Sequence, residues 1–289
     1  MSSTPELREP SLLELDLRTA RGRFAGLRNG NSGAPPLLAL HGWLDNAASF
    51  APMAPFLAGY DLVALDLPGH GQSFHYPVDA EYSLFSTLLD VLAAADALGW
   101  TRFTLLGHSM GGAIASLLAS AAPERIERLR LIEAIGPLAA SEDTTAERLR
   151  EAVAKRRALD GKRKRVFDDP DLAVRARMQT NITSLDEASA RLLVGRGLNI
   201  VEGGYEWSSD TRLTLPTAVR MSEAQVADCL RAIVCPVRMV MADPAPPYIP
   251  TAMRDGRIAC VRDIACTVLP GSHHLHMTHP REVVEALGL

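Results

Sequence analysis

A serine lies at the centre of a Gly-His-Ser-Met-Gly motif at residues 107–111. Residues 102–106 before the motif have the pattern of a strand, and residues 113–120 after it have that of a helix. A serine on so sharp a turn has its Oγ exposed, and its flanking positions are glycines because a Cβ there would clash. The backbone N–H of Met110 points into the start of the helix, where it can stabilise developing negative charge. The motif in this context favours a nucleophile, Ser109, over a tight turn with an incidental serine.

A serine hydroxyl is a weak nucleophile and needs a histidine as base and a carboxylate that orients the histidine. On a turn of this kind the chain order is serine, then aspartate or glutamate, then histidine. Residues 270–280 follow the last predicted strand and contain four histidines, so we expect the base there. A metal site built from His273, His274 and His276 has suitable ligand types but no supporting carboxylate within the segment. We therefore expect a catalytic base in this segment and no metal ion.

The composition is that of an ordinary globular protein. The chain has 289 residues, 47% hydrophobic and 22% charged, enough for one large domain or two modest ones. The net charge of −4 does not suggest a nucleic-acid partner or an anionic membrane surface. The basic run at residues 155–165 is most simply a solvated helix face and loop.

Targeting signals and cysteine spacing give the expected location. Residues 1–10 are polar and do not resemble a signal peptide, and no apolar stretch reaches the length of a membrane span. The four cysteines match no zinc or redox spacing, so we expect reduced thiols. The expected location is the cytoplasm.

Strand and helix patterns alternate along most of the chain, which indicates a parallel sheet covered by helices on both faces. The alternation is interrupted by a mostly helical, charged block, which we interpret as an inserted helical cap. The expected domains are a core at residues 1–136 and 233–289 and a cap at residues 137–232. Strands are expected at residues 11–18, 23–28, 36–40, 61–67, 102–106, 128–132, 237–241 and 266–269, and helices at residues 47–58, 83–98, 110–121 and 280–287.

From about residue 37 to its end the chain resembles the α/β-hydrolases. The resemblance rests on His-Gly-Trp at residues 41–43, on Asp-Leu-Pro-Gly-His-Gly-Gln-Ser at residues 66–73, on the serine turn and on the histidine segment. It implies that the base is the histidine seven residues before the proline that opens the last helix, which is His273, with His274 as the alternative. It also implies that the second oxyanion donor is the backbone N–H of Trp43, beside that of Met110.

The resemblance leaves two candidates for the acid. The family usually places it after the strand that follows the cap, where this chain has Asp243, two residues before the expected position. A second arrangement, seen in haloalkane dehalogenases, places a glutamate at the end of the strand before the cap, where this chain has Glu133. A charged residue at the end of an apolar strand needs a partner or a task. We favour Glu133 over Asp243, whereas Asp66 is expected to hold its own loop.

The subfamily with the greatest resemblance is the serine hydrolase-like one, to which Asn46 and residues 205–207 also point. The resemblance implies hydrolysis of a small carboxylic ester, or a related acyl compound, through an acyl-enzyme and without a cofactor. Serine as nucleophile disfavours dehalogenation and epoxide hydrolysis. Carbon–carbon bond hydrolysis, cofactor-free haloperoxidation and a non-catalytic small-molecule binding protein stay open as alternatives. A homodimer also stays open.

Overall fold

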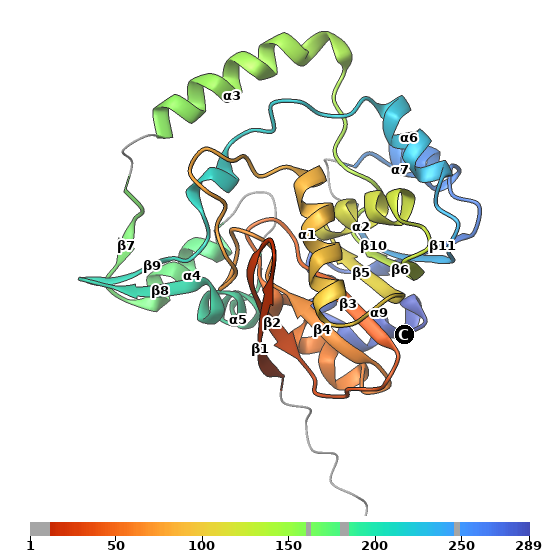
Figure 1. Ribbon diagram of the computed structural model, residues 1–289, viewed down its shortest axis with the longest axis horizontal. Helices are drawn as coiled ribbons and strands as arrows, with labels where there is room; N and C mark the ends of the chain where they lie inside the picture. Colours follow the sequence, from red (N-terminus) through yellow and green to blue (C-terminus); the bar gives the residue numbers. More distant parts are fainter. Residues whose placement is uncertain (1–11, 160–162, 180–184, 246–248) are drawn as a thin grey trace, which may run out of the picture.

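A mostly parallel sheet forms the centre of the structure, a computed structural model that describes residues 12–159, 163–179, 185–245 and 249–289 (Figure 1). In this part of the chain the sheet has eight strands, in the order β1-β2-β4-β3-β5-β6-β10-β11. β1 and β2 form an antiparallel hairpin, β2 pairs antiparallel with β4, and all pairs from β4 to β11 are parallel. The strands are β1 Leu13–Thr19, β2 Gly22–Arg28, β3 Pro36–Leu40, β4 Asp61–Leu65, β5 Phe103–His108, β6 Ile126–Ile132, β10 Val237–Asp243 and β11 Ile264–Pro270.

Helices cover both faces of the sheet, and each face has its own apolar core. Leu38 and Leu40 of β3 pack in the core beneath α1 (Leu84–Ala97), α2 (Met110–Ala121) and α6 (Glu223–Arg231). Leu37 and Ala39 of the same strand point to the opposite core, beneath η1 (Ala47–Phe56) and α9 (Pro280–Leu287). Successive side chains of a strand face opposite sides, so a strand buried on both faces has a continuous apolar run. The expected sheet with helices on both faces is confirmed.

The chain leaves the sheet after β6 and returns to it at β10, and we call residues 137–232 between them the insertion. It contains α3 (Thr145–Leu159), α4 (Pro170–Met178), α5 (Glu187–Gly197) and α6. It also contains an antiparallel sheet with the order β7-β9-β8, which the expectation of a helical block missed. These strands are short and mostly half-exposed, so they leave no apolar run in the sequence. Their bounds are β7 Val166–Phe167, β8 Leu198–Val201 and β9 Gly204–Trp207.

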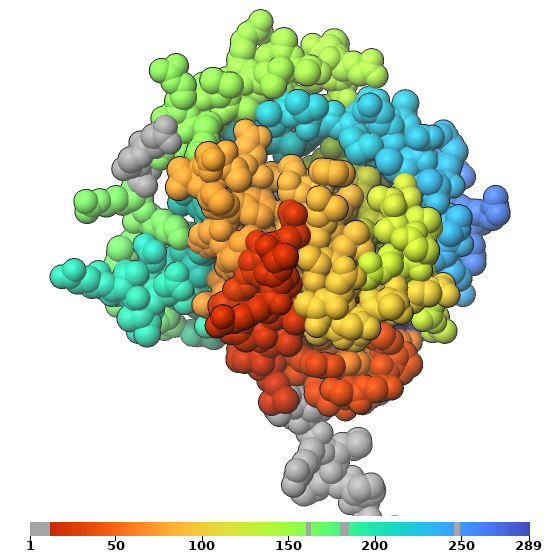
Figure 2. Space-filling model, viewed as in Figure 1, coloured from red at the N-terminus to blue at the C-terminus, as the bar shows by residue number. Residues whose placement is uncertain are grey.

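Helix α3 lies at the upper edge of the molecule in Figure 2, in green, above orange and cyan parts of the chain. Two of its arginines hold it there. Arg156 donates to the carbonyl oxygen of Val78 at 2.6 Å, and Arg148 donates to that of Thr217 at 3.1 Å. In the described residues no helix is both long enough and apolar enough to cross a membrane.

The short elements near the carboxyl end were not expected from the sequence. Helix α7 follows β10, and the single-turn helix α8 follows β11 and carries part of the histidine segment. An apolar core inside the insertion includes Phe167 and Leu193 and extends to Met277 of α8. The insertion is therefore packed directly against the histidine segment. The bounds of these two helices are α7 Thr251–Ile258 and α8 Leu275–Thr278. The insertion also contains the short 3-10 helices η2 Glu142–Thr144 and η3 Thr211–Thr214.

Candidate active site

Ser109 lies on the turn between β5 and α2, as expected. Its φ of 53° and ψ of −116° are a conformation that residues with a side chain rarely adopt. A Cβ on Gly107 would lie 2.4 Å from the Gly111 carbonyl oxygen, and one on Gly111 would lie 2.0 Å from that of Leu40. The two glycines therefore permit a close approach of backbone to backbone. The Ser109 N–H donates to the Ile132 carbonyl oxygen at 2.9 Å, which anchors the turn to the end of β6.

Glu133 and His273 meet beside this turn. Glu133 follows β6, is fully buried, and has a φ of 57°. One carboxylate oxygen, Oε2, accepts a hydrogen bond from Nδ1 of His273 at 3.0 Å, and the other, Oε1, accepts the N–H of Ala242 at 2.5 Å. Asp243 lies exposed at the end of β10. Of the two candidate acids, Glu133 is the one that the structure brings to the imidazole.

The histidine segment is fixed to the serine turn through the backbone. His108, which precedes the serine, donates from Nε2 to the His273 carbonyl oxygen at 2.9 Å, and the centres of the two rings are 4.8 Å apart. Among the described residues no hydrogen bond joins the Ser109 side chain to the His273 imidazole. Burial lowers the pKa of His273 to about 4, although the hydrogen bond to Glu133 acts to raise it. His273 is therefore neutral near pH 7, the form in which a histidine accepts a proton.

The loop after β3 holds Trp43, the expected second oxyanion donor. His41 fixes the start of this loop, because its Nδ1 donates to the Gly42 carbonyl oxygen at 2.8 Å and its Nε2 accepts the Leu67 N–H at 3.0 Å. Burial lowers the pKa of His41, in keeping with this neutral tautomer. The Trp43 ring is half-exposed, and its Nε1 donates to the Leu213 carbonyl oxygen at 2.9 Å. Because Gly111 touches the end of β3, this loop lies beside the start of α2, which carries Met110.

Asp66 lies in a structural position, as expected. Its carboxylate accepts the N–H groups of Ala47 and Gln72, at 2.7 and 2.9 Å, and so closes the loop at residues 66–73. It also accepts Nε of Arg196 from the insertion at 2.9 Å. Asp66 thus joins three segments of the chain and does not contact the imidazole of His273.

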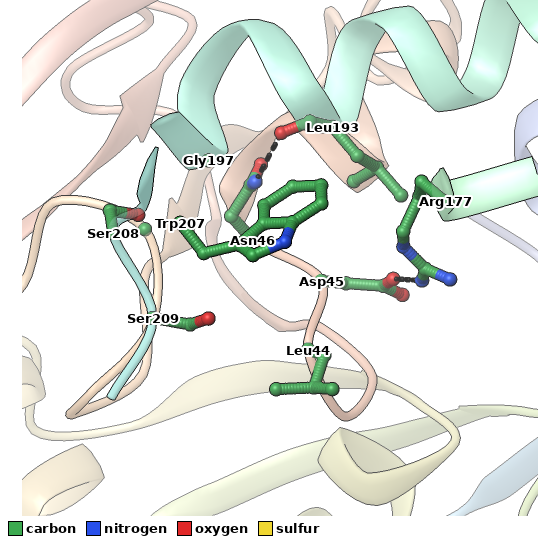
Figure 3. A pocket seen from close by; sticks show the side chains of 10 residues that line it. Leu44, Asp45, Asn46, Arg177, Leu193, Gly197, Trp207, Ser208 and Ser209 are labelled. Carbon is green, nitrogen blue, oxygen red and sulfur yellow. Dashed lines mark hydrogen bonds and ion pairs between the residues drawn. The ribbon is translucent and has the colours of Figure 1, made fainter. Parts of the chain in front are cut away.

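Asp45 is a buried carboxylate whose role the sequence did not reveal. Its Oδ1 accepts a hydrogen bond from Nη2 of Arg177 at 2.5 Å (Figure 3). Its Oδ2 accepts one from Nε2 of His274 at 3.1 Å and lies 3.6 Å from Nδ1 of His108. Burial alone would raise the pKa of Asp45, but His274, His108 and Arg177 outweigh it and hold the pKa well below its usual value. Asp45 is therefore a buried anion between the neighbours of Ser109 and His273.

The histidines do not converge as the metal alternative required. Nδ1 of His273 is bound to Glu133, and Nε2 of His276 lies 2.7 Å from the Ser49 hydroxyl. A different set, Asp45, His108 and His274, offers ligand atoms within 4.8 Å of one another. The Arg177 guanidinium on the same carboxylate opposes a second positive charge there. We therefore interpret this set as a network of hydrogen bonds and charges.

Comparisons with known proteins match this chain by sequence and by fold. A family model described as the α/β hydrolase fold matches residues 35–191. A serine hydrolase-like protein of Dictyostelium discoideum is 33% identical over 83% of this chain and 70% of its own length. The crystal structure of a hypothetical protein from Pseudomonas aeruginosa is 41% identical, with a TM-score of 0.88 over 95% of this chain and 96% of that one. A thioesterase domain from the curacin biosynthetic pathway has the same fold, with a TM-score of 0.82 at 24% identity over 96% of this chain and all of the other.

Proposed function

This chain belongs to the α/β-hydrolase family, in its serine hydrolase-like group, and we propose that it hydrolyses a carboxylic ester or a related acyl compound through an acyl-enzyme intermediate. The observation that carries the proposal is the buried 3.0 Å hydrogen bond between Nδ1 of His273 and Glu133, beside the strained Ser109 turn. Because Nδ1 donates to a carboxylate, the lone pair of the neutral imidazole is on Nε2, the nitrogen that a serine base uses.

In the proposed first step Nε2 of His273 takes the proton of Ser109 as Oγ attacks the substrate carbonyl carbon. The N–H groups of Met110 and Trp43 stabilise the negative charge on the carbonyl oxygen. The protonated imidazole then gives its proton to the leaving alcohol, and the acyl group stays on Oγ. In the second step His273 activates a water that releases the acid and restores the serine. Glu133 stabilises the imidazolium in both steps, and contact between serine and histidine often tightens only with substrate bound.

The insertion is proposed to act as a cap over the site. It contacts the loop of Trp43 and packs against α8, and both lie at the carboxyl ends of the strands, where ligands bind in such sheets. An ester or thioester fits a serine nucleophile with a neutral base, and the curacin thioesterase domain has the same fold. These points favour an uncharged ester or thioester as the substrate.

The test is hydrolysis of short-chain p-nitrophenyl esters together with covalent labelling by a fluorophosphonate. The parent protein should turn over the ester and gain one label, and Ser109→Ala should lose both. Ser120→Ala, at the other end of α2, is the matched control and should keep both. A parent protein that binds ester analogues but neither hydrolyses them nor takes the label would overturn the proposal in favour of a binding protein. Turnover that persists in Ser109→Ala would also overturn it.

A further inference from the structure

We propose that Asp45 is a positioning residue that couples the insertion to the catalytic groups through its contact with Arg177. The inference rests on the proposed function and adds a route by which the cap controls it. One buried carboxylate contacts Arg177 of the insertion, His274 next to the proposed base, and His108 next to the proposed nucleophile. Asp45 also belongs to the loop that carries Trp43, the proposed oxyanion donor.

The insertion holds this loop through three side chains with polar atoms near the end of the loop, at residues 43, 45 and 46. Trp43 donates to the carbonyl oxygen of Leu213 at 2.9 Å, and Asp45 accepts from Arg177. Asn46 donates to the carbonyl oxygen of Leu193 at 2.8 Å, and Figure 3 shows this bond and the Asp45–Arg177 contact among the side chains that line one pocket.

A strained residue lies between the first two of these contacts. Leu44 has a φ of 58°, in the left-handed region that residues with a side chain rarely adopt. Strain of this kind persists only where surrounding contacts hold it. The contacts of Trp43 and Asp45 with the insertion flank Leu44 on both sides. We infer that the loop keeps its shape because the insertion is in place.

The histidine segment depends on the insertion in the same way. Asp45 holds Nε2 of His274, and Met277 packs in the apolar core of the insertion with Leu193. Two residues after His273 are therefore held in place: His274 by Asp45, which pairs with the insertion, and Met277 by the insertion itself. If α4 moved away, Asp45 would be left buried without its guanidinium partner, and a buried charge stripped of its partner is strongly unfavourable. Departure of α4 should thus disturb the loop and the histidine together.

The insertion offers a matched control for this contact. Arg196 of α5 makes a second buried pair with Asp66 at 2.9 Å, with side chains 8% and 0% exposed, against 9% and 1% for Arg177 and Asp45. Both arginines thus join the insertion to a buried aspartate of the core. In the described part of the chain Asp66 makes no hydrogen bond with a histidine. Arg196 also pairs with Glu14 at 2.6 Å, so a purely structural role predicts that Arg196→Met loses at least as much stability and rate as Arg177→Met. The proposal instead predicts the larger loss of catalytic rate for Arg177→Met.

The experiment compares Arg177→Met with Arg196→Met in the full chain, by pre-steady-state ester hydrolysis and thermal unfolding. We expect Arg196→Met to lose at least as much Tm as Arg177→Met, but a loss of about tenfold or more in the acylation rate only for Arg177→Met, because small displacements of catalytic groups are costly. KM should change less than kcat. Asp45→Asn should share the defect, and Arg177→Lys should recover part of the rate because it keeps the charge.

Equal acylation rates in the two methionine variants, corrected for the folded fraction, would overturn the proposal. If Arg177→Met does not fold, Arg177→Lys and Arg196→Lys give the same comparison, and equal rates there would overturn it too. Failure of the proposed function is distinguishable, because it appears in Ser109→Ala and in the fluorophosphonate label of the parent protein. A coupling defect instead leaves Ser109 as the labelled residue and lowers only the rate of labelling.

Discussion

Replacing Glu133 by glutamine should place the proton of His273 on the wrong nitrogen. Oε1 of Glu133 accepts the Ala242 N–H at 2.5 Å, and in a glutamine only the carbonyl oxygen could take that place. The glutamine NH2 group would then face Nδ1 of His273, which is 3.0 Å from Oε2 in the parent protein. Nδ1 would have to accept a hydrogen bond rather than donate one. The imidazole proton would move to Nε2, and the base could not take the proton of Ser109.

The loss should resemble that of a Ser-His-Asp enzyme whose aspartate becomes asparagine, about 10³–10⁴ in kcat, or about 4–5.5 kcal/mol of transition-state stabilisation. The assay is ester hydrolysis at saturating substrate near neutral pH, with thermal unfolding to confirm the fold. Asp243→Asn is the control, and because Asp243 is exposed it should keep kcat within about threefold. A folded Glu133→Gln variant that keeps kcat within about tenfold would refute the tautomer argument, and so would a loss of about a hundredfold in Asp243→Asn.

The acid limb of kcat/KM should lie near pH 4, because burial lowers the pKa of His273 to about 4. Of the groups that face the imidazole, Glu133 raises this pKa, whereas His108 and His274 lower it. A pH–rate profile measures this, and a limb at about the ordinary histidine pKa of 6.5 would contradict it. The free energy of unfolding should fall as the pH drops below about 6.5, because burial lowers the pKa values of His41, His70 and His276 and these histidines then bind protons only in the unfolded chain. Urea titrations that show no such fall would contradict this. Gly111→Ala should cost about 2–3 kcal/mol or prevent folding, whereas Gly195→Ala, at an open position in α5, should stabilise by about 0.5–1 kcal/mol; equal denaturation midpoints would count against the close approach at Gly111. The free energy of unfolding of Ser109→Gly should be about 1 kcal/mol higher than that of Ser109→Ala, since glycine adopts a positive φ without strain. Calorimetry that ranks the two variants the other way would argue against strain at the turn.

Local patterns predicted the elements that place Ser109 and the histidine segment. Helices α2 and α9 have the expected bounds, because each begins at a clear signal: the serine turn for one, and a proline for the other. The three short strands of the insertion escaped prediction, since they have no buried apolar run. Helix α7 was also missed, as its eight residues contain a glycine and three charged side chains. Patterns were therefore informative where an element is buried on one or both faces.

The contacts of Asp45 could not be predicted from the sequence. Asp45 and Arg177 are 132 positions apart, and Asp45 and His274 are 229 apart. No local periodicity in the sequence connects positions so far apart. An aspartate and an arginine that pair on the surface are also the same residue types as a buried pair. The motif around His41 placed Asp45 in the loop proposed to form the oxyanion hole, but only the packing of the insertion shows that its carboxylate is buried and paired. The one hint in the sequence was the position of this aspartate, two residues after Trp43, the expected oxyanion donor.

The register of the sheet explains why Glu133, rather than Asp243, meets the histidine. His108 of β5 pairs with Ile132 of β6, and Ile132 pairs with Val240 of β10. Ser109 and Glu133 are therefore the first residues past one common level, on adjacent strands, and each leaves the sheet with a positive φ. Asp243 lies two residues beyond the level of Glu133, about 6–7 Å further along its strand. An acid at the level of Glu133 lies at the carboxyl ends of the central strands, where it is buried, accepts the Ala242 N–H and reaches Nδ1 of His273. The left-handed turn at Glu133 is thus the counterpart of the serine turn. Each ends its strand abruptly at the same level, and from there the Glu133 carboxylate reaches Nδ1 of His273.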